Sequence, residues 1–81
     1  MEESPETKIT ELFSNHFGIE KNGLNPSMDL QKDLNLSALE VADFITILEN
    51  TFHIEIPGEE SKKWTTIADI INSVADHGNF T

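Results

Sequence analysis

The stretch Asp33-Leu34-Asn35-Leu36-Ser37-Ala38-Leu39-Glu40 leads directly into an apolar-striped run from Val41 to Phe52. Ser37 is followed three residues later by Glu40, which is the capping-box pattern of a helix N-terminus. In this pattern the Ser oxygen accepts a hydrogen bond from the third helical N–H, and the Glu carboxylate reaches back to the N–H of the cap. The segment therefore predicts a loop that ends at Ser37 and a long helix that begins immediately after it.

Caps and helical spacing predict three further helices. Ser4-Pro5 places a capping Ser before a Pro at the first helical position, and Gly18 supplies a C-terminal stop. Pro57-Gly58 breaks the chain, and residues 59–63 leave room for only a turn or two of helix. Thr66 to Asp69 form a second capping box, which opens the last helix. No segment shows sustained strand alternation, so we expect an all-α fold with three main helices and one short one.

The apolar residues of these helices define the expected core. The first helix contributes Ile9, Leu12, Phe13 and Phe17, the second Leu39, Ala42, Phe44, Ile45, Leu48 and Phe52, and the last Ile67, Ile70, Ile71 and Val74. The connection from Ile19 to Leu36 is long for a small domain. We expect its own apolar residues, Leu24, Met28, Leu30, Leu34 and Leu36, to hold it against that core.

Length, composition and net charge exclude several classes of protein. Eighty-one residues make a single domain over residues 1–81, with a core at 5–76, and we expect a monomer. The chain has no Cys, which excludes disulfides, thiolate zinc sites and thiol nucleophiles. No apolar run approaches the ~20 residues of a membrane span, so we expect a cytoplasmic protein. The net charge of −10 disfavours nucleic acid and membrane partners and favours proteins with basic patches.

The loop before Ser37 also offers a possible calcium site. The residues at positions 1, 3, 5, 7, 9 and 12 of an EF-hand-like loop would be Asp29, Gln31, Asp33, Asn35, Ser37 and Glu40. Leu34 stands where the sharp turn of such a loop requires Gly, and Asn25-Pro26 interrupts the place of its incoming helix. A calcium-binding helical protein is therefore one of three functional hypotheses.

Other candidate chemistry is sparse. His16, His53 and His77 are scattered, without the spacing that places two ligands on one helical face. No Gly-rich phosphate loop or Ser-His-Asp set is present. We therefore predict no catalytic residues, no metal ligands among the histidines and no enzymatic activity.

The order of motifs in the second half resembles that of acyl carrier proteins. Leu48 to Pro57 is similar to the end of their second helix and its exit loop, and Gly58-Glu59-Glu60 to their short third helix. Trp64 to Ile67 resembles the start of their fourth helix, and Asp33-Leu34 the segment before their attachment site. The resemblance covers residues 6–76 and implies a four-helix bundle of the acyl carrier protein type, with a core able to sequester an acyl chain. It also implies 4′-phosphopantetheine as the cofactor, carried on a Ser at the start of the second helix.

The family's attachment triplet is Asp-Ser-Leu, whereas this chain has Ser37-Ala38-Leu39. The resemblance places Ala38 at the attachment position, where it has no hydroxyl, either naturally or because a Ser was replaced to keep the protein in its apo form. Two interpretations of Ser37 stay open: it accepts the arm one residue early, or it is only the helix cap. A one-residue shift turns a helical side chain by about 100°, and a cap hydroxyl faces backbone N–H groups, which favours the cap.

The resemblance further implies an acidic surface on the second helix that docks on basic-surfaced enzymes of acyl-chain or related biosynthesis, including fatty acid biosynthesis. Its residues here are Glu40, Val41, Asp43, Thr46, Glu49 and Glu55, with Glu59 and Glu60 extending it. The leading hypothesis is a carrier that presents an acyl or related group through this surface, with an atypical or removed attachment site. The second is a degenerate homologue that acts as a non-acylated acidic docking module.

Overall fold

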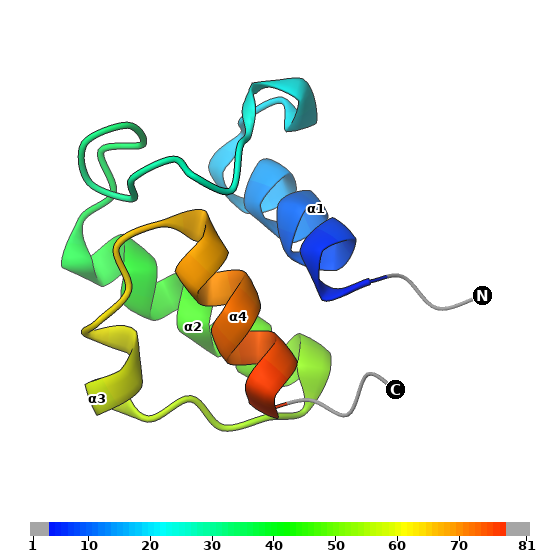
Figure 1. Ribbon diagram of the computed structural model, residues 1–81, viewed down its shortest axis with the longest axis vertical. Coiled ribbons are helices and arrows are strands. Elements are labelled where there is room, and N and C mark those ends of the chain that lie inside the picture. The colour runs from blue at the N-terminus through cyan, green and yellow to red at the C-terminus, as the bar shows by residue number, and fades with distance from the viewer. Residues whose placement is uncertain (1–3, 78–81) are drawn as a thin grey trace.

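The computed structural model describes residues 4–77 as a bundle of helices in which the connection between the first two main helices is long and the later connections are short (Figure 1). Its elements are α1 (Pro5–Phe17), the 3₁₀ turn η1 (Lys21–Gly23), α2 (Ala38–Phe52), α3 (Gly58–Ser61) and α4 (Ile67–His77). Within the described range there is no strand, only an isolated antiparallel bridge between Asp29 and Thr66. The expected all-α fold is confirmed, with three main helices, α1, α2 and α4, and one short helix, α3.

The ends of α1 follow from the residues that stand there. Ser4 has an extended backbone, and its hydroxyl accepts a hydrogen bond from the N–H of Thr7 at 3.2 Å. Gly18 adopts the left-handed conformation with φ 69°, and its N–H donates to the carbonyl of Ser14 at 2.9 Å. Both ends therefore satisfy backbone groups that would otherwise lack partners.

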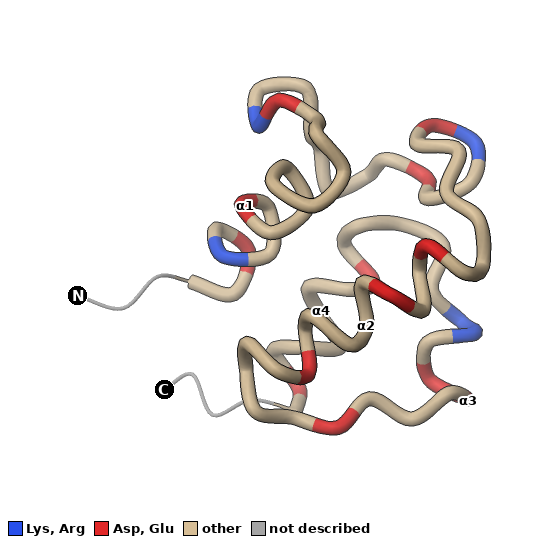
Figure 2. Tube along the Cα trace, turned by 180° about the vertical axis from the view of Figure 1, so that it is seen from behind, with Lys and Arg blue, Asp and Glu red and all other residues tan. Residues whose placement is uncertain are grey.

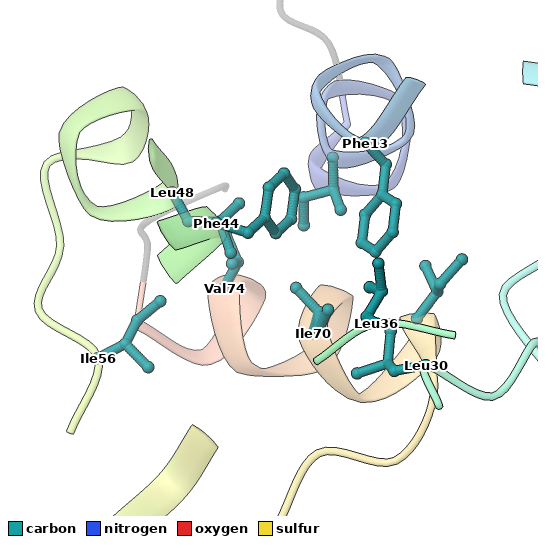
Figure 3. Packing of buried hydrophobic residues seen from close by; sticks show 10 residues of the cluster. Phe13, Leu30, Leu36, Phe44, Leu48, Ile56, Ile70 and Val74 are labelled. Carbon is teal, nitrogen blue, oxygen red and sulfur yellow. The ribbon is translucent and has the colours of Figure 1, made fainter. Parts of the chain in front are cut away.

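The core is a single cluster to which every main helix and the long connection contribute (Figure 3). Its buried members are Ile9, Phe13, Leu30, Leu36, Phe44, Leu48, Ile56, Ile67, Ile70 and Val74. Phe13 of α1 and Phe44 of α2 meet edge to face, with ring centroids 4.7 Å apart, and Phe17 lies 5.5 Å from Phe44. Phe44 thus occupies the centre of the bundle.

The connection before α2 is held as the sequence predicts. Leu30 and Leu36 are buried, and three further apolar side chains, those of Leu24, Met28 and Leu34, pack against the core. Its backbone also bonds to the start of α4: the N–H of Ile67 donates to the Met28 carbonyl at 3.2 Å, and that of Leu30 to the Thr65 carbonyl at 2.8 Å. These bonds tie the connection to α4 and so fix the point from which α2 departs.

The apolar face of α2 differs from the prediction. Phe44 and Leu48 are buried, but Leu39 is 72% exposed and Ala42 is also exposed. Leu48 lies nine positions after Leu39, and at about 100° per residue this separation places the two side chains on opposite sides of the helix. The assignment of Leu39 and Ala42 to the core was therefore wrong. Their exposure leaves two small or apolar positions on the outer surface of the helix.

No helix in the part of the chain from 4 to 77 combines the length and apolar character that crossing a membrane requires.

Candidate functional site

The N-terminus of α2 is closed by the predicted capping box. The Ser37 Oγ accepts a hydrogen bond from the Glu40 N–H at 3.1 Å, and the Glu40 Oε1 accepts one from the Ser37 N–H at 2.9 Å. Ser37 has the extended backbone of a cap, with φ −84° and ψ 166°. Its hydroxyl oxygen is therefore directed to the helix backbone. Ala38 follows as the first helical residue and is exposed.

The loop before this cap is shaped by its own carboxylates. The Asp29 Oδ1 accepts from the N–H groups of Gln31 and Lys32, each at 2.8 Å, and the Asp33 Oδ2 accepts from the Asp29 N–H at 2.7 Å. The backbone bonds from Lys32 and then Gln31 hold the pKa of Asp29 below its ordinary value. Asn35 completes the turn in the left-handed region with φ 55°.

This arrangement differs from a calcium-binding loop. The carboxylates of Asp29 and Asp33 accept hydrogen bonds from the loop backbone, and an EF-hand loop follows a helix, whereas this loop follows η1 and turns. In residues 4–77 no three His, Asp or Glu side chains are grouped so that they could hold a metal ion. The geometry gives no support to the calcium hypothesis.

A groove of about 270 Å³ opens beside Ala38, between α2 and the segment that contains α3. Its lining residues are Leu30, Gln31, Ala38, Val41, Ala42, Ile45, Ser61, Lys62 and Trp64. Lys62 is the one charged residue among them. The half-buried side chain of Trp64 is oriented by the hydrogen bond that its Nε1 donates to the Ser73 Oγ at 2.7 Å. The groove thus places a largely uncharged surface next to the capped end of α2.

The predicted docking residues occupy two environments. Glu40, Asp43, Thr46 and Glu55 are exposed. Val41 is half-buried and lines the groove. Figure 2 shows that α2 carries acidic but no basic positions along its length.

Glu49, the remaining docking candidate, has a structural role. It is half-buried, and its Oε2 accepts the Ile56 N–H at 2.8 Å. This bond fastens the loop after α2 to the helix itself, so one oxygen of this carboxylate is already committed within the fold.

Two side-chain contacts near α3 are not indicated by the sequence. One is the Trp64–Ser73 hydrogen bond, and the other joins the His77 Nε2 to the Glu60 Oε1 at 2.8 Å. Both partners come from separate elements, and nothing in their local sequence spacing indicates the pairing. The third histidine, His53, takes part in neither contact; it is the C-cap of α2 and has a left-handed backbone with φ 57°.

The N-terminus of α4 repeats the cap seen at α2. The Asp69 Oδ2 accepts from the N–H groups of Thr65 and Thr66 at 2.8 and 3.0 Å, and the Asp69 N–H donates to the Thr66 Oγ1 at 3.3 Å. The first two bonds hold the pKa of Asp69 below its ordinary value of 3.8. The predicted capping box is confirmed.

Comparison with known proteins agrees with this architecture. A family model described as "Phosphopantetheine attachment site" matches residues 7–74. The acyl carrier protein of Rubrobacter xylanophilus is 31% identical over 70 residues, 86% of either chain, and that of Lactobacillus acidophilus is 29% identical over 76 residues, 94% of this chain and 95% of the relative. A solved structure from Mycobacterium tuberculosis, described as an acyl carrier protein, superposes with a TM-score of 0.81 at 26% identity, over 89% of this chain and 96% of the other.

The family defines the broad class of function. Acyl carrier proteins are carriers and not enzymes, they work with biosynthetic enzymes, and the family model implies 4′-phosphopantetheine as the prosthetic group. With four helices in the expected order and a family match that spans most of its length, the chain belongs to the acyl carrier protein family.

Proposed function

We propose that this chain is a carrier-family domain that docks on basic-surfaced biosynthetic enzymes and does not bear the phosphopantetheine arm at the start of α2. One observation carries the proposal: the only hydroxyl there, that of Ser37, accepts the Glu40 N–H at 3.1 Å as the helix cap. The family resemblance places the next residue, Ala38, at the attachment position, and Ala has no side-chain hydroxyl with which to form a phosphodiester. The residues present at this position therefore do not fit the group.

Docking is the part of carrier function that these residues can still perform. Glu40 and Asp43 lie one helical turn apart on exposed positions of α2, in a chain with a net charge of −10. Such a surface attracts basic patches and speeds encounter with them in a salt-dependent manner. Exposed Leu39 lies between the cap and these acids, and an apolar side chain within a charged rim is a typical arrangement at a protein interface. The same charge repels nucleic acid and anionic membrane surfaces.

Intact-mass measurement after incubation with a phosphopantetheinyl transferase and coenzyme A tests the proposal. We expect the chain to gain no phosphopantetheine and the Ala38→Ser variant to gain one. The second candidate function, a loaded carrier, is favoured by the exposure of Ser37 at the correct end of α2. A mass gain in the unmodified chain that disappears in Ser37→Ala would establish that candidate and overturn our proposal.

The docking surface is tested with charge reversals. Binding of Ala38→Ser to the same transferase, measured by calorimetry at two salt concentrations, should weaken when Asp43→Lys or Glu55→Lys is added, since both residues are exposed and neither belongs to the capping box. Glu20→Lys is the matched control because Glu20 is exposed but lies on the connection after α1. Equal weakening by all three reversals would show that only net charge matters, and would contradict a docking surface on α2.

A further inference from the structure

The turn η1 carries the one Asn-Gly pair of the chain, Asn22-Gly23. Both residues are exposed, no residue of η1 is buried, and the turn has no side-chain cap. The Gly23 N–H donates to the Glu20 carbonyl at 2.9 Å, and the Leu24 N–H to the Lys21 carbonyl at 3.0 Å. Short 3₁₀ turns have poor hydrogen-bond geometry, and an exposed turn opens more readily than packed helices do. The backbone nitrogen of Gly23 is therefore released whenever the turn opens.

An open Asn-Gly pair is able to close into a ring. The backbone nitrogen of Gly23 attacks the side-chain Cγ of Asn22 and forms a new C–N bond. The amide nitrogen of Asn22 leaves as ammonia, which takes up the proton of the Gly23 N–H, and a five-membered succinimide ring is left. Gly permits the close approach that this attack requires because it has no Cβ. A Cβ built at Gly23 would meet nothing within 4 Å, so the rest of the fold does not crowd this position either.

Water opens this ring in two ways. Cleavage between Cγ and the Gly23 nitrogen gives Asp at position 22, whereas cleavage between the backbone carbonyl carbon and that nitrogen gives isoaspartate. Either product adds a negative charge to a chain whose net charge is −10. Isoaspartate also adds a carbon atom to the backbone within η1, which disrupts the hydrogen bonds that close the turn. The isoaspartate form therefore holds Leu24, which packs against the core, less firmly.

The fold protects the other asparagines of residues 4–77 from this reaction. Asn25 is followed by Pro26, whose nitrogen carries no hydrogen. Asn35 is followed by the buried Leu36, whose N–H donates to the Leu30 carbonyl at 2.9 Å. The remaining ones lie inside α1, α2 and α4, where continuous hydrogen bonding fixes the backbone; they are Asn15, Asn50 and Asn72. Ring closure therefore meets the least resistance at Asn22.

We propose that Asn22 is a site of spontaneous deamidation, at which the chain converts into a more acidic form with Asp or isoaspartate in η1. Water is the co-reactant and ammonia the leaving group, so the reaction needs no enzyme. An ion pair between the Lys21 Nζ and the Glu11 Oε1, 3.3 Å apart, ties the turn to α1, but it is exposed to solvent and contributes little to keeping the turn closed. The site lies on the connection after α1, so the inference holds whether or not Ser37 or residue 38 ever bears an arm.

Mass spectrometry during incubation of the intact chain at about pH 8 and about 37 °C tests the proposal, because Asp and isoaspartate are heavier than Asn. Digestion at about pH 4 with a protease that cleaves after Glu releases residues 21–40 as one peptide, and the low pH suppresses further ring closure. Fragment masses then compare Asn22, Asn25 and Asn35 within that peptide. Conversion at Asn22 should exceed that at either of the others by about tenfold or more, because Gly alone leaves the attack unhindered. No conversion at Asn22, or equal conversion at all three, would overturn the proposal.

Matched variants test the mechanism. Gly23→Ala keeps Asn22 but places a Cβ beside the attacking nitrogen, and conversion should fall by about tenfold. Because that Cβ meets open space, the fold is retained. Gly58→Ala is the control, since its Cβ also meets open space and Gly58 does not follow an Asn; conversion at Asn22 should be unchanged. Undiminished conversion in Gly23→Ala, or an equal decrease in Gly58→Ala, would overturn the proposal. A helical circular dichroism spectrum confirms that each variant is folded.

Discussion

Replacing Ser37 by Ala distinguishes the two candidate roles of its hydroxyl, which are the cap of α2 and the attachment point for the arm. In the structure the Ser37 Oγ accepts the Glu40 N–H at 3.1 Å, and the Glu40 carboxylate returns a bond to the Ser37 N–H at 2.9 Å. Ser37→Ala removes the first bond outright and leaves the Glu40 N–H without an acceptor from the cap. Loss of a capping Ser costs about 1 kcal/mol, within a range of about 0.5–2 kcal/mol.

Thermal unfolding followed by circular dichroism measures this loss. For a domain of this length, a change of about 1 kcal/mol lowers the melting temperature by about 4–8 °C. Ser37→Asp should restore most of the loss, because Asp is as good a cap as Ser and its charge is favourable at a helix N-terminus. Ser14→Ala, within α1, is the control, since Ala there has the higher helix propensity and should not destabilise the helix.

Two outcomes would refute the assignment of Ser37 as the cap. The first is an unchanged melting temperature in Ser37→Ala. The second is an equal loss in Ser37→Ala and Ser37→Asp, because a cap substitution that retains an acceptor should retain stability. The first result would leave the hydroxyl of Ser37 without a structural role and would strengthen its candidacy as the attachment point.

Three further predictions concern the stability of the bundle. Phe44→Ala removes a ring that is 1% exposed and whose centroid lies 4.7 Å from that of Phe13. It should lower the free energy of unfolding, measured with urea, by about 3–5 kcal/mol. A decrease below about 1 kcal/mol would contradict the central place of Phe44 in the core. Gly18→Ala should lower the free energy of unfolding by about 1–2 kcal/mol, because Gly18 has the left-handed φ of 69°. At Gly23 a Cβ meets open space and the backbone is not left-handed, so Gly23→Ala should be nearly neutral. Equal effects of the two substitutions would contradict the left-handed cap at Gly18. Because the pKa values of Asp69 and Glu60 are lowered by folding, their stabilisation is present above the unfolded values of 3.8 and 4.5 and is lost as pH falls through the lower folded values. The melting temperature should therefore fall below about pH 4.5, less steeply in Asp69→Asn, and an unchanged slope in that variant would refute the link.

The helix ends could be predicted from the sequence because each depends on residues within one turn of it. Ser4 and Gly18 bound α1, and Ser37 with Glu40 opens α2, through bonds that span three or four residues. The contacts between elements could not be predicted in this way. The bond of Trp64 to Ser73 links positions whose proximity is set by how α3 and α4 pack, and no local rule of spacing contains that information.

The apolar face of α2 was predicted only in part, because the helix buries a narrower face than its apolar pattern indicates. Phe44 and Leu48 are one turn apart and point into the core, where they contact residues of other helices. Leu39 has the same chemistry as Leu48 but lies half a helical rotation away from it. Its exposure therefore follows from geometry that the sequence does contain. The angle between positions is a stricter criterion for burial than hydrophobicity alone, since apolar residues are common on protein surfaces.

The same reasoning distinguishes the two residues at the start of α2. Ser37 is tied to the fold by two hydrogen bonds, so the structure itself accounts for a hydroxyl there. Ala38 is exposed and lines the open groove beside α2, and the cap of the helix is Ser37, so neither packing nor capping requires Ala at this position. A Ser at position 38 would be compatible with the helix, because the difference in helix propensity between Ala and Ser is at most about 0.7 kcal/mol. Folding therefore does not explain the absence of a hydroxyl at residue 38, which is consistent with our proposal that this absence determines what the chain can be loaded with.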